Sequence, residues 1–319
     1  MPHAASARGV QGAEWMCKGR ACGPRVPMKV GGLFVDRSGA PRLFIRRVSP
    51  DPEAVWAHLL LVHASMVHSE YYLPLASDLA SRGVAVWLPD LRGHGRSGGV
   101  PGHLTAWRDH VRDVADAYQV MQREAAPSTP LLLGGESYGG LVAYLALQGQ
   151  VVAPAASVLL SPALGLTFAV GPAVRWCLAH AGPVLSRIRP VRPLGYVGIS
   201  ADPYIGRLIE SDRQASRHYT LGFLTCLLDA VDQAAAAPWA NASPLLALLS
   251  AGDGVCDNRV AQQLLGGRPG ITLRTLAAPQ HSLVADLSGS LAGEVLAWLD
   301  GVGFRRPRGR SATQRGWSS

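Results

Sequence analysis

Two short stretches of the chain carry a serine in the pattern G-x-S-x-G. "GRSGG" centres on Ser97, and "GESYG" centres on Ser137. The pattern is typical of a serine nucleophile held on a sharp turn, and such a serine attacks the carbonyl carbon of an ester or an amide. One catalytic site needs one nucleophile, so the residues around each serine must decide between the two.

The surroundings of Ser137 fit a nucleophile turn, and those of Ser97 do not. The turn needs a strand leading in, small residues on both sides and a helix leaving directly. "LLLGGESYGGLVAYLALQ" supplies all three, and the helix N-terminus would favour negative charge developing near Ser137. Ser97 is followed by Val100, Pro101 and Gly102, which begin no helix. We therefore expect Ser137 to be the nucleophile and Ser97 to be a loop residue.

A serine nucleophile needs a general base, and the base needs an acid that orients it. When the serine follows a parallel strand in this way, the chain order is Ser, then Asp or Glu, then His. Asp253 follows the strand-like run "PLLALLS", and His281 follows "ITLRTL". Asp257 directly precedes a helical segment, and we expect it to cap that helix. The predicted triad is Ser137, Asp253 and His281, and we expect the other histidines to be structural or loop residues.

Short apolar runs alternate with helix-length segments along the chain. This alternation predicts a mainly parallel sheet with helices on both faces. The segment "GGLFVDRSGAPRLFIRRV" predicts an antiparallel hairpin that turns at residues 38–40. The predicted strands are residues 58–64, 84–90, 130–135, 156–162, 244–250 and 271–276, and the predicted helices are residues 71–82, 105–124, 141–150, 258–265 and 286–300.

The alternation is interrupted at residues 162–243, which contain no comparable strand-like run. Two helical pieces there, "AVRWCLAHA" and "HYTLGFLTCLLDAV", predict a helical cap between core strands. Such a cap would cover the carboxyl edge of the sheet, where open α/β sheets bind ligands. We expect the core to comprise residues 28–161 and 244–301. Candidates for an acyl-chain pocket, each of which could instead only pack the cap onto the core, are Met66, Leu164, Leu166, Phe168 and Trp176.

The net charge of +8 belongs to the two ends of the chain. Residues 1–27 carry +3 and residues 302–319 carry +5, so residues 28–301 are neutral. We expect disordered ends and no nucleic-acid partner, and a weaker alternative is contact of the basic ends with a membrane surface. The uncharged stretch 151–174 is interrupted by prolines, and we expect a buried strand there rather than a membrane span.

The cysteines and the N-terminal residues bound the class of protein further. Five cysteines without metal-type spacing predict mostly reduced thiols, and the N-terminus shows no apolar targeting segment. These features predict a cytoplasmic protein.

Residues 29–301 resemble the monoacylglycerol lipase and lysophospholipase group of α/β-hydrolases, which also contains serine aminopeptidase-like members. The resemblance rests on "VHASMVHSEYYLPLASDLASRGVAVWLPDLRGHGRSGG", "GGESYGGLVAYLAL", "AGDGVCD" and "PQHSLVAD". It implies the α/β-hydrolase fold and the triad Ser137, Asp253 and His281. It also implies that the backbone N–H groups of Ser65 and Tyr138 stabilise the oxyanion, and it implies no cofactor and no metal.

The sequence departs from this group at two places. The group usually has His-Gly followed by small residues in the oxyanion loop, whereas this chain has His63, Ala64, Ser65 and Met66. Glycine freely adopts backbone angles and close approaches that alanine does not, so the donor geometry of this loop is an open question at the level of sequence. The residue before the nucleophile is Glu136 in place of the commoner His.

The predicted function is a serine hydrolase that cleaves carboxylic esters with an acyl chain, of the monoacylglycerol or lysophospholipid type, through an acyl-enzyme. The same triad would also serve an acyltransferase, a thioesterase or an aminopeptidase, because the fold does not choose the acceptor. A catalytically weak binding protein of the same fold is a further alternative, which the altered oxyanion loop motivates.

Overall fold

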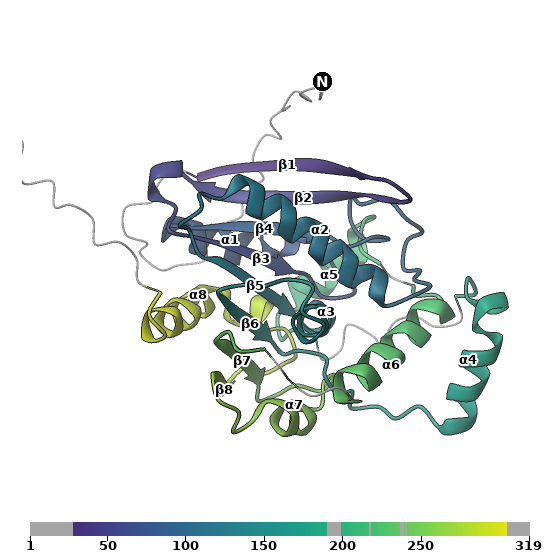
Figure 1. Cartoon of the computed structure of the whole chain (residues 1–319). Helices are drawn as coiled ribbons and strands as arrows, with labels where there is room; N and C mark the ends of the chain where they lie inside the picture. Colours follow the sequence, from purple (N-terminus) through teal and green to yellow (C-terminus); the bar gives the residue numbers. More distant parts are fainter. Residues whose placement is uncertain (1–27, 190–198, 217, 237–238, 240, 305–319) are drawn as a thin grey trace, which may run out of the picture.

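The computed structural model describes residues 28–304 except 190–198, 217, 237–238 and 240 (Figure 1). The expected N-terminal extension and residues 305–319 of the expected C-terminal tail lie outside the described residues.

A single eight-stranded sheet forms the centre of the described chain, in the order β1-β2-β4-β3-β5-β6-β7-β8. β1 and β2 form the expected hairpin and pair antiparallel, and β3 to β8 pair parallel. Each strand lies close to its predicted position, which confirms the predicted sheet. The strands are β1 (Met28–Arg37), β2 (Ala40–Pro50), β3 (Ala57–Val62), β4 (Val84–Asp90), β5 (Leu131–Glu136), β6 (Ala156–Leu160), β7 (Leu245–Ser250) and β8 (Ile271–Leu276).

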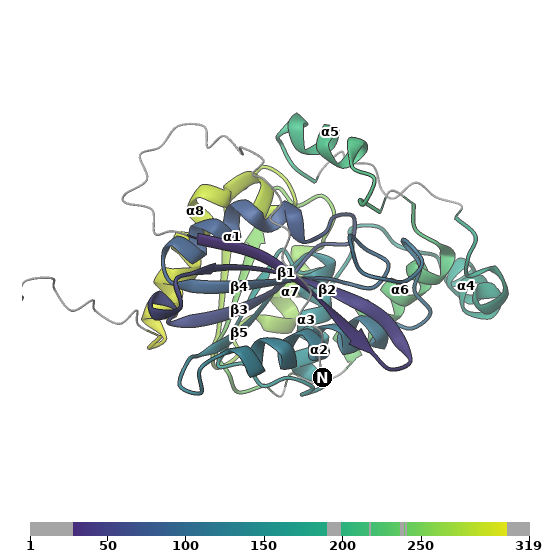
Figure 2. The same cartoon turned by 90° about the horizontal axis from the view of Figure 1, so that it is seen from above.

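Helices cover both faces of the sheet, with α1 and α8 on one face and α2 and α3 on the other (Figure 2). Every residue of β3 is buried, because successive side chains alternate between two apolar layers. Leu60 packs in the layer of α2 and α3, and Leu61 packs in the layer of α1 and α8. The helices are α1 (Leu73–Ser81), α2 (Arg108–Glu124), α3 (Tyr138–Gln148), α4 (Pro172–Leu185), α5 (Pro203–Ser211), α6 (Leu221–Ala236), α7 (Asn258–Leu265) and α8 (Leu283–Gly301).

Three of these helices, α4, α5 and α6, lie between β6 and β7, and we call residues 162–243 the insertion. α4 and α6 pack against each other, and α6 also packs against α3 (Figure 1). The two helical pieces predicted from sequence correspond to α4 and α6. α5 was not predicted, although Asp202 accepts the backbone N–H of Tyr204 at 2.9 Å and Pro203 opens the helix, a common start signal.

The uncharged stretch 151–174 contains β6, in agreement with the expected buried strand. Among the residues that the structure describes, no helix has both the length and the apolar character needed to cross a membrane.

Candidate active site

Ser137 occupies the turn between β5 and α3. Its backbone lies at φ 55° and ψ −119°, in a region that residues other than glycine rarely adopt. A Cβ on Gly135 would collide with the carbonyl of Gly139, and a Cβ on Gly139 would collide with the carbonyl of Val62. Both glycines of the motif are therefore required by close backbone approach, and the strained turn aims the Ser137 side chain away from the strand.

The structure brings the three predicted triad residues together. The Nε2 atom of His281 lies 2.7 Å from the Oγ atom of Ser137, and its Nδ1 atom lies 2.8 Å from the Oδ2 atom of Asp253. The other carboxylate oxygen of Asp253 accepts the backbone N–H groups of Val255 and Cys256, at 2.9 and 2.8 Å. The Asp253 side chain is fully buried. These contacts hold the carboxylate so that His281 keeps its proton on Nδ1 and can accept a proton from Ser137 at Nε2.

The charge state of His281 depends on two opposing effects. Burial lowers the pKa of the imidazole, but its contacts with Cys256 and Asp253 outweigh burial and raise the pKa well above 6.5. The Cys256 thiol is itself buried, and burial raises its pKa. A base at this position therefore holds its proton to higher pH than an ordinary histidine.

We expect kcat/KM for a neutral ester to fall on the acid side with an apparent pKa above 6.5. Only the neutral imidazole can accept the Ser137 proton, and the raised pKa of His281 keeps it protonated over a wider acid range. The measurement is a pH–rate profile with a chromogenic ester. An acid limb at or below pH 6.5 would contradict this assignment.

The oxyanion loop, residues 63–66, lies directly after β3 and against the start of α3. In the part of the chain that the structure describes, the backbone N–H groups of Ser65 and Tyr138 donate to no protein acceptor. Ala64, by contrast, donates its N–H to the Tyr72 hydroxyl at 2.8 Å. The geometry thus leaves available the two donors that the resemblance implies.

The loop keeps its shape without glycine. Ala64, Ser65 and Met66 all have negative φ, so their side chains cause no left-handed strain. The carbonyl of Ser65 accepts the Tyr219 hydroxyl, and the carbonyl of Met66 accepts the Ser216 N–H at 3.1 Å. Contacts from outside the loop therefore hold it where the sequence alone had suggested a need for glycine.

The second G-x-S-x-G motif is structural, as expected. The Ser97 hydroxyl donates to the carbonyl of Asp90 and accepts the Phe44 N–H at 2.8 Å, so it joins the end of β4 to β2. Asp257 accepts the Arg259 N–H at 3.0 Å and caps α7, also as expected.

Three buried histidines, one in the oxyanion loop and two packed beside it, are neutral. Burial lowers the pKa of His63 to about 3, that of His94 to about 3 and that of His110 to about 4. His63 accepts the Leu91 N–H at 3.0 Å, and His110 lies 2.8 Å from the Tyr138 hydroxyl. These side chains fill and hydrogen-bond the interior, which agrees with their predicted structural role.

The predicted pocket residues differ in their exposure. Leu164 is completely buried and packs in the hydrophobic core. Trp176 is 63% exposed on α4 and stacks on His180. Met66 is buried at the oxyanion loop, whereas Leu166 and Phe168 are partly exposed before α4. A role of these five residues in an acyl-chain pocket remains a prediction.

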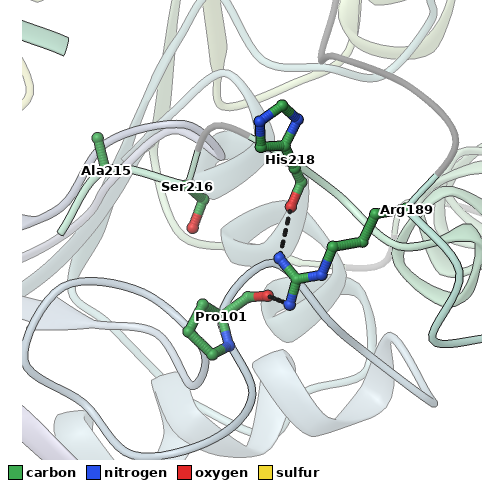
Figure 3. Close-up of a pocket in the computed structure, with 5 residues that line it drawn as sticks. All are labelled: Pro101, Arg189, Ala215, Ser216 and His218. Carbon is green, nitrogen blue, oxygen red and sulfur yellow. Dashed lines mark hydrogen bonds between the residues drawn. The ribbon is translucent and has the colours of Figure 1, made fainter. Parts of the chain in front are cut away.

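A cavity of about 320 Å³ lies between the loop at Pro101 and the segment that follows α5 (Figure 3). Arg189 spans it by donating to the carbonyls of Pro101 and His218, at 2.8 and 3.4 Å. Ala215 and Ser216 complete the lining, and Ser216 also bonds the oxyanion loop. None of the predicted pocket residues lines this cavity.

The residues around Glu136 were not recognised from sequence as part of the site. Its carboxylate binds Tyr72 and Ser282, which lie far apart in the chain. The unusual Glu before the nucleophile was the one available signal. A possible ligand set for a metal, Asp253, Cys256 and His281, coincides with the triad and its neighbour, and no separate metal centre is inferred from it.

The sequence matches a known protein family over most of its length. The family described as "Serine aminopeptidase, S33" matches residues 53–288. The chain belongs to this family. The S33 chain is 28% identical to human monoglyceride lipase over 271 residues, which cover 81% of the chain and 86% of that protein. It is also 28% identical to a monoacylglycerol lipase of Mycolicibacterium smegmatis over 165 residues, which cover 51% of the chain and only 56% of that relative.

Solved structures of the same architecture extend the comparison. A monoacylglycerol lipase of Paleococcus ferrophilus matches with a TM-score of 0.69 and 20% identity, over 81% of the S33 chain and 98% of its own. A soluble variant of the Saccharomyces cerevisiae monoglyceride lipase, solved with a substrate analog, matches with a TM-score of 0.68 and 16% identity. The match covers 84% of the S33 chain and 94% of the yeast chain. These matches confirm the predicted α/β-hydrolase fold.

Proposed function

We propose that this S33 family member is a serine hydrolase of carboxylic esters with an acyl chain, of the monoacylglycerol or lysophospholipid type. The observation that carries the proposal is the 2.7 Å contact between His281 Nε2 and Ser137 Oγ, with Asp253 bound to the opposite ring nitrogen. The monoglyceride lipase relatives support the same class of reaction.

The proposed reaction passes through an acyl-enzyme. Ser137 Oγ attacks the ester carbonyl carbon while its proton moves to His281 Nε2, and the carbonyl π electrons move to the oxygen. The N–H groups of Ser65 and Tyr138 stabilise that oxyanion. Collapse expels the alcohol, which takes the proton from His281. Water then repeats the sequence: its proton goes to His281, its oxygen joins the acyl carbon, and Ser137 leaves with the proton restored.

The substrate class rests on less direct support. The structurally described core and insertion belong to a neutral stretch of sequence, and Leu166 and Phe168 offer apolar surface before α4. An acyl chain is the partner that such surface would bind. Peripheral membrane contact through the basic ends and a cytoplasmic location remain parts of the proposal.

An amidase reaction is the second candidate, because the matching family is described by aminopeptidase activity. A panel of monoacylglycerols and lysophosphatidylcholines with short, medium and long acyl chains, together with aminoacyl anilides, separates the two. We expect turnover of the esters and labelling of the protein by a fluorophosphonate probe. Faster turnover of the anilides would favour the aminopeptidase, and a folded protein that neither labels nor hydrolyses would refute the hydrolase proposal.

A further inference from the structure

Glu136 is a buried carboxylate at the end of β5, next to the nucleophile. Only 3% of the residue is exposed, and three donors satisfy its two oxygens. The Tyr72 hydroxyl donates to Oε2 at 2.7 Å, and the Ser282 hydroxyl and the Val284 N–H donate to Oε1 at 2.9 and 3.0 Å. A carboxylate so enclosed and so fully bonded is poorly placed to touch a substrate, and its influence must pass through its partners.

The side-chain partners of Glu136 connect it to different parts of the site. The oxygen of the Tyr72 hydroxyl accepts the Ala64 N–H at 2.8 Å, so Tyr72 links Glu136 to the oxyanion loop. Ser282 directly follows His281 and caps the N-terminus of α8 by accepting the Ala285 N–H. Glu136 itself precedes Ser137. One side chain thus joins the turns that carry the nucleophile, the base and an oxyanion donor.

We propose that Glu136 is a positioning residue that fixes the positions of the oxyanion loop and the His281 loop relative to Ser137. The inference rests on the proposed hydrolase function, whose triad it would align. It also accounts for an oxyanion loop without glycine, because the Glu136–Tyr72 pair fixes the Ala64 N–H and thereby the residue whose carbonyl group forms the peptide bond to Ser65.

The directions of these hydrogen bonds require a carboxylate at position 136, because all three partners donate to it. Tyr72 points its proton at Glu136 and its lone pair at Ala64. In Glu136→Gln, an amide NH₂ would face either Tyr72 or the Ser282 and Val284 donors, so at least one donor would lose its acceptor. The nearly isosteric amide therefore fits the space but cannot satisfy the network.

Glu136 also interacts electrostatically with His281. The pKa of Glu136 is raised overall, because burial outweighs its hydrogen bonds and the charge of His281, which act in the opposite direction; the three donors around its two oxygens are the partners of an ionised carboxylate. The titratable groups that face His281 are Asp253 and Cys256 from the turn after β7 and Glu136 from β5. Loss of one negative charge from this set makes the protonated imidazole less stable.

The first test is Tyr72→Phe, with Tyr118→Phe as the matched control. Tyr118 is also a buried tyrosine, and its hydroxyl bonds the carbonyl of Ala153 at 3.1 Å, outside the site. We expect Tyr72→Phe to lower kcat for ester hydrolysis by about tenfold with KM nearly unchanged, since a misplaced oxyanion donor weakens the transition state more than substrate binding. Tyr118→Phe should lose similar thermal stability and keep wild-type kcat.

The second test is Glu136→Gln, measured at a temperature at which the variant is folded. We expect a larger loss of kcat than in Tyr72→Phe, together with an acid limb of kcat/KM at lower pH than in the wild type. Tyr72→Phe, which leaves the carboxylate in place, should keep the wild-type acid limb. A merely structural role would change thermal stability and leave both the kcat and the acid limb alone.

The outcomes separate the two proposals. An active wild type whose Tyr72→Phe and Glu136→Gln variants match Tyr118→Phe in kcat and in pH profile would overturn the positioning role and leave the hydrolase intact. A folded wild type that neither turns over esters nor reacts with a fluorophosphonate would overturn both. If Glu136→Gln fails to fold, Tyr72→Phe alone decides by its kcat relative to Tyr118→Phe.

Discussion

Replacing Ser137 with alanine should lower kcat for ester hydrolysis by about 10⁶-fold, the loss typical of a serine that acts as one unit with its base. The His281 imidazole would face a methyl group in place of the hydroxyl that lies 2.7 Å away. Residual turnover would reflect only substrate binding and the oxyanion donors. The measurement is steady-state hydrolysis of a chromogenic ester, together with loss of fluorophosphonate labelling.

The chain provides a matched control in its second G-x-S-x-G motif. Ser97→Ala removes the same hydroxyl from the same pattern, but that hydroxyl bonds Asp90 and Phe44. We expect lower thermal stability and a kcat close to that of the wild type below the unfolding transition. Turnover that survives in Ser137→Ala, or is abolished in folded Ser97→Ala, would contradict the assignment of the nucleophile.

Asp253→Asn should lower kcat by about 10⁴-fold. The Oδ1 atom of Asp253 accepts two backbone N–H groups, so the asparagine carbonyl would take that place and turn its NH₂ group toward His281. The Nδ1 atom of His281 would then have to accept a hydrogen bond, and the ring proton would move to Nε2. In that tautomer the imidazole cannot take the Ser137 proton. The measurement is kcat at the pH optimum.

Asp257→Asn is the control for this variant, because the residue lies four positions away and caps α7. Asparagine caps helices about as well as aspartate, so folding and kcat should stay near their wild-type values. An Asp253→Asn enzyme that keeps most of its activity would show that another group orients His281.

The strands and the triad could be predicted because local signals coincide with the fold. β3 is buried along its whole length, as its mainly apolar sequence indicates. Ser137, Asp253 and His281 each follow a parallel strand, and parallel strands bring their carboxyl ends to one edge. The order of elements along the chain was therefore sufficient to bring three distant residues together.

The surroundings of the triad could not be predicted in the same way. Leu164 and Trp176 are both apolar residues of the insertion, yet one is completely buried and the other is mostly exposed. Tertiary packing decides between them, and no local pattern records it. Likewise, Tyr72 and Ser282 meet at Glu136 from opposite parts of the chain, and only the folded structure shows that they share an acceptor.

The oxyanion loop is held from the insertion as well as from the core. Tyr219 and Ser216 lie between α5 and α6, and they bond the carbonyls of Ser65 and Met66. The peptide groups that would meet the substrate oxygen are thus tethered to the insertion by two hydrogen bonds. The placement of the two proposed oxyanion donors therefore depends on how residues 216–219 pack as well as on the core.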